Sequence, residues 1–214
     1  MIKDIKKYEE FEQLKDVVKF HGHLCFGIAL GYRVAKCANK YFRRDIDEDL
    51  VAIVGNNSCS VDAIQFLLGC TFGKGNLIHK DYGKHVYVFY SRNYKKALRI
   101  SVKGDLFEYV NSLAEDFENY KKSLKEENKN EEEVKERLKQ YSKELREKII
   151  DKVLKTPEKE LLNLEWIDIN PPKKAKIYKS IKCEECGEYF MEIKGRVANG
   201  KIVCKECFER LINE

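Results

Sequence analysis

Histidine and cysteine side chains gather at two short segments in the first third of this 214-residue chain. The first segment contains His21, His23 and Cys25, and the second contains Cys59 and Asp62. Imidazole nitrogen and thiolate sulfur bind zinc, iron or copper better than magnesium or calcium. If folding joins the two segments, they form a candidate site for zinc or iron.

The roles of these five side chains follow from their chemistry. We expect one or both histidines and Cys59 to bind the metal, and Asp62 to support a ligand or accept a proton. Cys25 lies near the expected start of a helix, where the helix dipole favours a thiolate. It could be a ligand or a nucleophile, and the residues leave this open. A metal with a free position would polarise a carbonyl or activate water, so Cys25, Cys59 and Asp62 are candidate catalytic residues. The alternative is that the histidines cap helices and the cysteines are small buried residues.

Four further cysteines form a second group near the C-terminus. Two Cys-x2-Cys pairs are separated by 17 residues, which is the spacing of a tetrahedral zinc site. The ligands would be Cys183, Cys186, Cys204 and Cys207. Four thiolates complete the coordination shell and leave no position for a substrate. We therefore expect a structural zinc, with rubredoxin-like iron as the alternative.

Composition limits the classes of protein to which the chain could belong. No apolar stretch approaches 18 residues, so we predict no membrane span. The first thirty residues lack the pattern of a secretory signal, and eight cysteines with metal-type spacing suit the reducing cytoplasm. A net charge of +5 is too small to indicate nucleic-acid binding, although it does not exclude it.

Helices and strands alternate in the part of the chain that must position the first group. Apolar spacing predicts helices over 5–20 and 24–41 and a third helix from about residue 61, capped by Ser58 or Ser60. Strands are predicted at 50–54, 85–90, 97–102 and 166–169. This mixture indicates an α+β domain.

A helical hairpin is predicted over residues 105–155. Two apolar stripes at helical spacing flank a polar turn at 127–130, where Asn130 and Glu133 resemble a capping box. A stripe of this kind either packs within the hairpin or contributes to a homodimer. After the hairpin, Asn170-Pro171-Pro172 and the following lysines indicate a linker. The predicted domains are therefore residues 1–170 and 171–214.

The second domain resembles a treble-clef zinc finger, with a knuckle, a hairpin and a helix that carries the last ligands. It is too small to fold by apolar burial alone, and structural zinc can supply the missing stability. Its ten basic and seven acidic residues give only +3, so nucleic-acid binding has little support here.

Several runs of residues resemble the FmdE-like family of formylmethanofuran dehydrogenase proteins. They are Phe20–Gly27, Cys59–Gln65, Gly69–Asn76 and Lys80–Lys84. The resemblance covers roughly residues 10–170. It implies a thioredoxin-like α+β core, with a five-stranded mixed sheet flanked by helices, and a metal-binding active site at the histidine and cysteine motifs.

The same resemblance implies a homodimer and a link to a formylmethanofuran dehydrogenase complex of methane production. The chain would act there as an accessory factor or as a metalloenzyme. The alternative is a non-catalytic zinc-finger scaffold that docks to a partner complex or to nucleic acid. Two positions depart from the family pattern: Phe26 replaces a proline, and Gly55 replaces an acidic residue that could serve as a ligand or base.

Overall fold

The computed structural model of the chain describes residues 3–44, 48–126 and 130–213. It consists of two compact units, Met1–Lys174 and Ala175–Glu214. The division falls shortly after the boundary predicted from the two prolines. Each unit has its own hydrophobic cluster and is described by itself.

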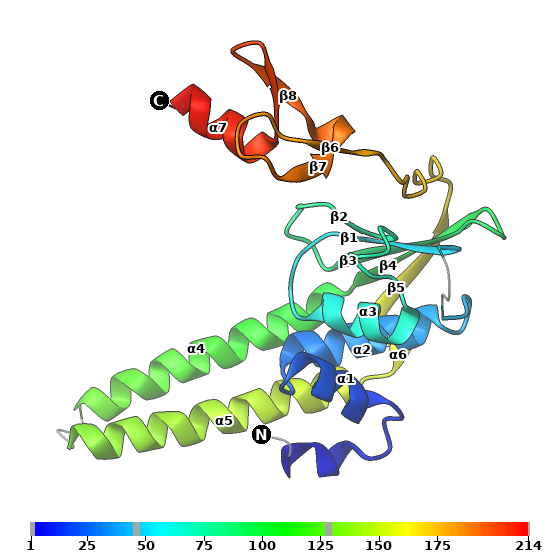
Figure 1. The fold of residues 1–214 in the computed structure, drawn as a ribbon. Helices are drawn as coiled ribbons and strands as arrows, with labels where there is room; N and C mark the ends of the chain where they lie inside the picture. Colours follow the sequence, from blue (N-terminus) through cyan, green and yellow to red (C-terminus); the bar gives the residue numbers. More distant parts are fainter. Residues whose placement is uncertain (1–2, 45–47, 127–129, 214) are drawn as a thin grey trace. The chain divides into compact units, whose positions relative to one another are not determined.

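The larger unit contains a five-stranded mixed sheet with the order β2-β1-β3-β4-β5 (Figure 1). The strand β1 (Leu50–Val54) is parallel to β2 (Leu77–His79) and antiparallel to β3 (Val86–Ser91). On the other side, β4 (Lys96–Val102) is antiparallel to both β3 and β5 (Leu162–Ile167). The predicted five-stranded mixed sheet of an α+β domain is confirmed.

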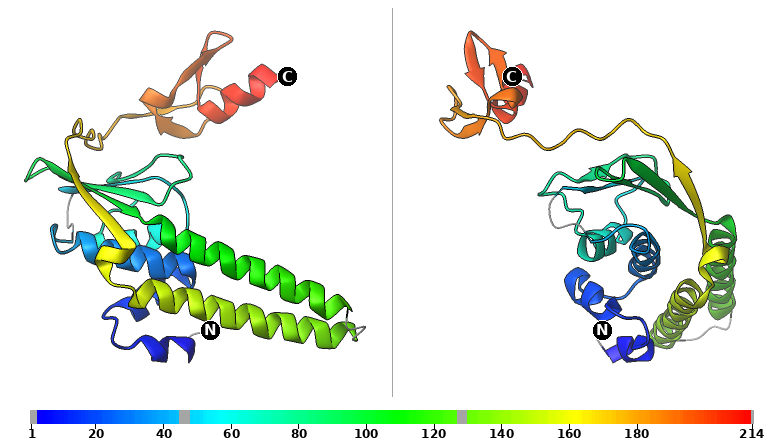
Figure 2. Two further views of the ribbon diagram at one scale, coloured as in Figure 1. Left: turned by 180° about the vertical axis from the view of Figure 1, so that it is seen from behind. Right: turned by 90° about the vertical axis from the view of Figure 1, so that its right-hand side faces the viewer.

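The helices of this unit are α1 (Leu14–His21), α2 (Phe26–Ala38), α3 (Ser60–Leu68), α4 (Gly104–Glu126), α5 (Glu131–Lys155) and the short α6 (Glu158–Leu161). They lie on one face of the sheet, as Figure 2 shows. On that face the side chains of alternate strand residues are buried among helix side chains, as the two-residue period of a strand requires.

The first predicted helix, 5–20, is interrupted in the structure. A 3-10 helix, Lys3–Tyr8, is followed by a turn, and α1 begins only at Leu14. Gln13, at the N-cap, has a φ of 68°, which no helix interior accommodates. The apolar spacing persists across the turn because Tyr8 and Leu14 are both buried in the same core.

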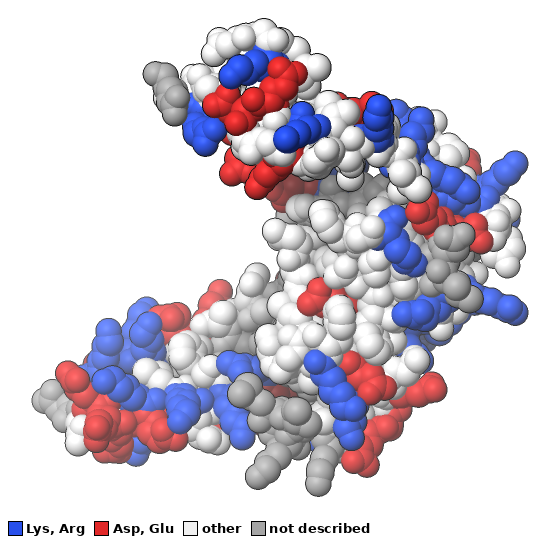
Figure 3. Space-filling model, in the orientation of Figure 1, with Lys and Arg blue, Asp and Glu red and all other residues white. Residues whose placement is uncertain are grey.

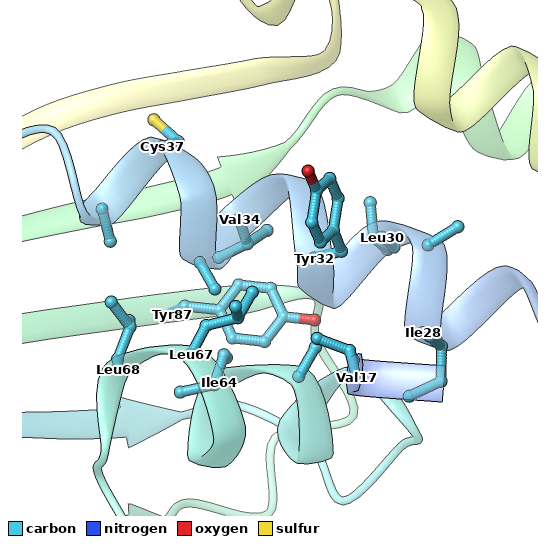
Figure 4. Close-up of a cluster of buried hydrophobic side chains, with 14 of the residues drawn as sticks. Val17, Ile28, Leu30, Tyr32, Val34, Cys37, Ile64, Leu67, Leu68 and Tyr87 are labelled. Atoms are coloured by element: carbon cyan, nitrogen blue, oxygen red, sulfur yellow. The ribbon is translucent and has the colours of Figure 1, made fainter. Parts of the chain in front are cut away.

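Tyr87 of β3 lies at the centre of that core. Its ring is packed among side chains of α2 and α3, including Val34, Ile64 and Leu67 (Figure 4). None of the Tyr87 surface is exposed, so its hydroxyl must find partners inside the protein. One of those partners is the hydroxyl of Ser60, at the start of α3.

The hairpin predicted over 105–155 is formed by α4 and α5, which lie side by side as two long helices (Figure 2). Phe117 and Tyr120 of α4 pack on Tyr141 of α5. Charged side chains of both signs lie on the face of the hairpin that Figure 3 shows. Asn130 caps α5 by accepting a hydrogen bond from the N–H of Glu132. The rest of the predicted turn, residues 127–129, lies outside the described residues.

The smaller unit has two short antiparallel strand pairs and one helix. The strands are β6 (Ser180–Lys182), β7 (Tyr189–Met191), β8 (Arg196–Ala198) and β9 (Lys201–Val203), and a 3-10 turn, Glu192–Lys194, follows β7. The helix α7 (Lys205–Asn213) begins directly after Cys204 and carries Cys207 in its first turn. The pattern of knuckle, hairpin and ligand-bearing helix matches the order predicted from the sequence.

Candidate metal centre

The two cysteines of the first group lie at the adjacent N-termini of α2 and α3. Cys25 is the N-cap residue of α2 and Cys59 that of α3. The close approach of α2 to the start of α3 depends on glycines in α2. A Cβ atom built on Gly27 would lie 2.9 Å from Cβ of Cys59, and one built on Gly31 would lie 2.2 Å from the backbone oxygen of Ser60. Only residues without a side chain allow the helices to come this close.

His21 reaches the same place from the last residue of α1. Gly22 follows in a left-handed conformation, with φ of 102°, and ends the helix there. The Nδ1 atom of His21 lies 2.7 Å from a carboxylate oxygen of Asp62, in the first turn of α3. The other Asp62 oxygen accepts a hydrogen bond from Nε2 of Gln65 at 3.2 Å. The His21 ring is therefore held in a fixed orientation.

The donor atoms of His21, Cys25 and Cys59 all lie within 4.8 Å of one another. Nε2 of His21 is buried and has no hydrogen-bond partner, and it is the one such side-chain atom among the residues that the structure describes. An unpartnered buried nitrogen costs free energy unless something binds to it. Folding thus brings three of the five predicted groups into one cluster, with Asp62 directly behind His21.

His23 lies outside this cluster. Its side chain is exposed, although its ring centroid is only 4.6 Å from that of His21. The turn at Gly22 leaves the two rings beside each other without bringing the nitrogens of His23 to the two thiols. Gln65, in contrast, was given no role from sequence. Its position three residues after Asp62, on the same side of a helix, was the available signal.

Two effects act in opposite directions on the ionisation of Cys25. Its Sγ accepts a hydrogen bond from the N–H of Ile28 at 3.4 Å, as a helix N-terminus allows. Burial nevertheless raises the pKa of Cys25, and the neighbouring Cys59 adds to the rise. Without a metal, Cys25 is therefore a protonated thiol at neutral pH.

The residues around Cys59 correct one further expectation and explain one departure from the family pattern. Neither Ser58 nor Ser60 caps α3, because their hydroxyls bond to each other at 2.7 Å. Gly55, where the family pattern has an acidic residue, has no room for a side chain. A Cβ atom there would lie 2.8 Å from the backbone oxygen of Lys84. The strand crossing beside Gly55 thus excludes a ligand or base at that position in this chain.

The four cysteines of the smaller unit also form a cluster. Their Sγ atoms all lie within 4.8 Å of one another, close to the roughly 3.8 Å that separates thiolates around tetrahedral zinc. Burial opposes ionisation of Cys183, but the backbone N–H groups of Cys186 and Cys204 outweigh it and lower the pKa of this thiol to about 6. Burial and the neighbouring thiols raise the pKa of Cys207 to about 12, and the pKa of Cys186 is also raised, so Cys183 is the thiol of this cluster that ionises most readily.

Two known protein families match the segments that contain the two clusters. The family described as FmdE, molybdenum formylmethanofuran dehydrogenase operon, matches residues 20–163, which include the whole first cluster. The chain belongs to the FmdE family. A prokaryotic dksA/traR C4-type zinc finger matches residues 176–212, so this FmdE protein also contains a zinc-finger module. The resemblance noted from the motifs is confirmed, and the protein is a metal-binding protein.

Two relatives define how far this similarity reaches. A probable S-adenosyl-L-methionine-binding protein of Archaeoglobus fulgidus is 32% identical over 202 residues, covering 88% of this chain. The chain spans only half the length of that relative. The crystal structure of an FmdE-like protein of tungsten formylmethanofuran dehydrogenase from Syntrophus aciditrophicus covers 95% of this chain and is itself covered to 91%. Its TM-score is 0.55 at 23% identity, which shows a shared fold.

The prediction that the chain has no membrane span can be compared with the helices. Among residues 3–44, 48–126 and 130–213, no helix combines the length and the apolar character needed to cross a bilayer.

Proposed function

We propose that this FmdE-family protein binds two metal ions, a structural zinc in the C-terminal finger and a functional zinc or iron at the core cluster. The observation that carries the second ion is Nε2 of His21, a buried and unpartnered nitrogen beside two thiols. The first ion follows from four clustered cysteines within a zinc-finger module, which we interpret as a treble clef.

The core residues suit zinc or iron by number and type. His21, Cys25 and Cys59 supply one nitrogen and two sulfur donors, a set found in catalytic zinc sites that keep a fourth position for water or substrate. Asp62 would fix the His21 ring and increase its basicity as a ligand. We assign Cys25 as a ligand because its Sγ lies within 4.8 Å of the donor atoms of both His21 and Cys59. His23 stands outside this ligand set.

A metal bound there would supply Lewis-acid chemistry toward a carbonyl group or a water molecule. Asp62 would then hold His21 in place, or exchange a proton at its carboxylate. The family's operon association supports a role in one-carbon metabolism beside a molybdenum or tungsten formylmethanofuran dehydrogenase, as an accessory factor or a metalloenzyme. The eight cysteines are all free thiols, which fits a reducing cytoplasm.

Metal counting tests the assignment. The purified chain should contain two metal equivalents by inductively coupled plasma mass spectrometry. Cys59→Ser should lose the core metal alone, and Cys186→Ser should lose the finger zinc alone. Cys37→Ala is the matched control, because Cys37 is a buried cysteine of the core outside both clusters. It should keep both metals. A Cys59→Ser protein that also keeps both would refute the core site.

A second candidate function is non-catalytic docking through the finger. Its surface exposes large apolar side chains, with Tyr189 at 73% and Val197 at 70% exposed. This composition favours a protein partner, such as a dehydrogenase complex, over a nucleic acid, whose binding surfaces are strongly basic. Mobility-shift assays with DNA and RNA at low salt should show no binding. Tight, salt-dependent binding would favour the nucleic-acid alternative instead.

We also propose that the chain forms a homodimer through the α4–α5 hairpin. Along the hairpin many apolar side chains remain half-exposed, among them Val110, Phe117, Leu138 and Ile149. Two helices cannot bury such stripes fully, whereas two hairpins can do so as a four-helix bundle.

A further inference from the structure

A chain of polar side chains runs through the core domain, away from the metal cluster's donor atoms. It joins Asn56, Ser58, Ser60, Tyr87 and His85. Consecutive members lie 2.7 Å apart from Asn56 Oδ1 through the two serine hydroxyls to the Tyr87 hydroxyl, and Nδ1 of His85 is 3.2 Å from that hydroxyl. Ser60 and Tyr87 are completely buried, so water cannot replace the bond between their hydroxyls.

The backbone fixes the orientation of Asn56, the first residue in this series of hydrogen bonds. Its Nδ2 donates to the carbonyl of Lys84 at 2.7 Å, and its Oδ1 accepts from the N–H of Ser58 at 3.0 Å. Backbone carbonyls only accept and backbone N–H groups only donate. The Asn56 atom that bonds to both the N–H and the hydroxyl of Ser58 is therefore the amide oxygen, which can only accept hydrogen bonds.

Each hydroxyl has one hydrogen, so the direction of every later bond follows. Ser58 must donate to Asn56, and Ser60 must then donate to Ser58. Tyr87 must donate to Ser60, which leaves its oxygen as the acceptor for His85. Nδ1 of His85 therefore carries a hydrogen. In the neutral ring Nε2 is then an acceptor with a free lone pair.

The environment of His85 keeps the ring neutral. Burial lowers the pKa of His85 below its ordinary value. Its ring lies beside the rings of Phe107 and Phe26, with centroids 5.2 and 6.2 Å away. His85 and Phe107 line a groove of about 510 Å³, together with Gly83, Lys84, Val86 and Val102. The groove is open to solvent, and its volume is large enough to hold a small ring system.

We propose that this groove binds a flat aromatic or heteroaromatic ring that carries an N–H or O–H donor. The ring would stack on Phe107, and its donor would bond to Nε2 of His85. Nε2 has no hydrogen-bond partner among the described side chains, and it is not among their buried unpartnered atoms, so it is open to the groove. Phe26, which follows Cys25 in the sequence, lies behind the rings of His85 and Phe107, with centroids 6.2 and 6.4 Å away. Binding requires no metal, and it can therefore fail or succeed independently of the metal sites.

The tautomer of His85 gives the first test. In the full chain labelled with ¹⁵N-histidine, long-range ¹H–¹⁵N spectra should show His85 protonated at Nδ1, with assignment by loss of the signals in His85→Ala. Tyr87→Phe removes the acceptor and should shift the proton toward Nε2. Tyr90→Phe is the matched control, since Tyr90 is also buried on β3 but packs on the other side of the sheet. A His85 protonated at Nε2 in the unaltered chain would overturn the proposal.

The second test compares the binding of three bicyclic probes of similar size. Calorimetry should show 2-naphthol binding at least about tenfold tighter than 2-methoxynaphthalene, which is flat but has no donor, because an acceptor left unpaired loses about one hydrogen bond. Decahydro-2-naphthol, with the same hydroxyl on a ring system that is not flat, should not bind. Phe107→Ala should abolish 2-naphthol binding, and Tyr87→Phe should reduce the preference for the donor. Equal affinity for the two flat probes, or unchanged binding by Phe107→Ala, would refute the groove.

Discussion

The carboxylate of Asp62 contacts the Nδ1 nitrogen of His21, one of the proposed metal ligands. A carboxylate behind a histidine ligand fixes the tautomer of the ring and strengthens it as a donor. We therefore expect Asp62→Asn to weaken core-metal binding by about 10- to 100-fold, measured by competition with a chromogenic chelator. Asp81→Asn, at an exposed carboxylate outside the cluster, is the control. Unchanged affinity in Asp62→Asn would show that Asp62 does not support the metal.

Cys37 illustrates a buried cysteine without a site. Burial raises the pKa of its thiol to about 12, from an ordinary value of 9.0. The unfolded chain loses this proton near pH 9 while the folded chain retains it. The free energy of unfolding should therefore fall as the pH rises from 9 to 12, by up to about 1.4 kcal/mol per pH unit from this group.

Cys37→Ala removes this contribution, so its stability should fall less steeply over the same range. Urea unfolding at pH 8, 9 and 10 measures the two slopes. Parallel slopes for the two proteins would contradict the burial argument.

The residue types of the site were predictable from the sequence, but the role of each residue was not. Sequence separation does not show that Gly22 turns the backbone so that His21 meets the thiols and His23 stays exposed. The effect of burial on the pKa of Cys25 was not predictable, because the helix terminus is visible in the sequence and burial is not. The tautomer of His85 depends on bonds between segments about thirty residues apart, which no local pattern reveals.

At the scale of elements, the site depends on how closely α2 and α3 approach. A Cβ atom on Gly31 would meet the Cα and the carbonyl oxygen of Ser60 at 2.6 and 2.2 Å, and backbone cannot move aside cheaply. We expect Gly31→Ala to destabilise the core by about 1–3 kcal/mol and to release the core metal while the finger keeps its zinc. Thermal unfolding with metal analysis would test both effects.

Gly104→Ala is the matched control for this substitution. Gly104 is the first residue of α4, and a Cβ atom there meets nothing within 4 Å. It should keep both the stability and the metal. If Gly31→Ala behaves like Gly104→Ala, the close packing of α2 on α3 does not position the cysteines.

Elements with an unbroken apolar run were predictable from sequence, whereas very short strands and interruptions within a helical pattern were not. The strand at 50–54 was predicted with its observed bounds because it is a continuous apolar run that ends at a glycine. The strand β2 was missed since three residues carry no measurable period. The helix over 5–20 was overextended because both segments around Gln13 face the same core.

At the scale of the whole molecule, the two units are stabilised by different means. The core domain buries a large cluster that includes residues from all six of its described α-helices, whereas the buried cluster of the finger consists of Cys183, Val203 and Cys207. Two of these three residues are proposed zinc ligands. The finger therefore depends on its metal for folding, whereas the core depends on apolar packing. This difference is the reason that Cys186→Ser should leave the core domain intact.

The proposed homodimer is the remaining property of the whole molecule. Beyond the core end of the hairpin, Leu113, Leu124 and Leu145 are buried, while most of the other apolar side chains stay half-exposed. Light scattering after gel filtration should give about twice the 25.1 kDa of one chain. Leu138→Lys places a charge within the stripe and should shift the mass toward one chain. Lys139→Ala, at the adjacent exposed position, should not. A mass of one chain for the unaltered protein would mean that the hairpin is covered by another partner or stands alone.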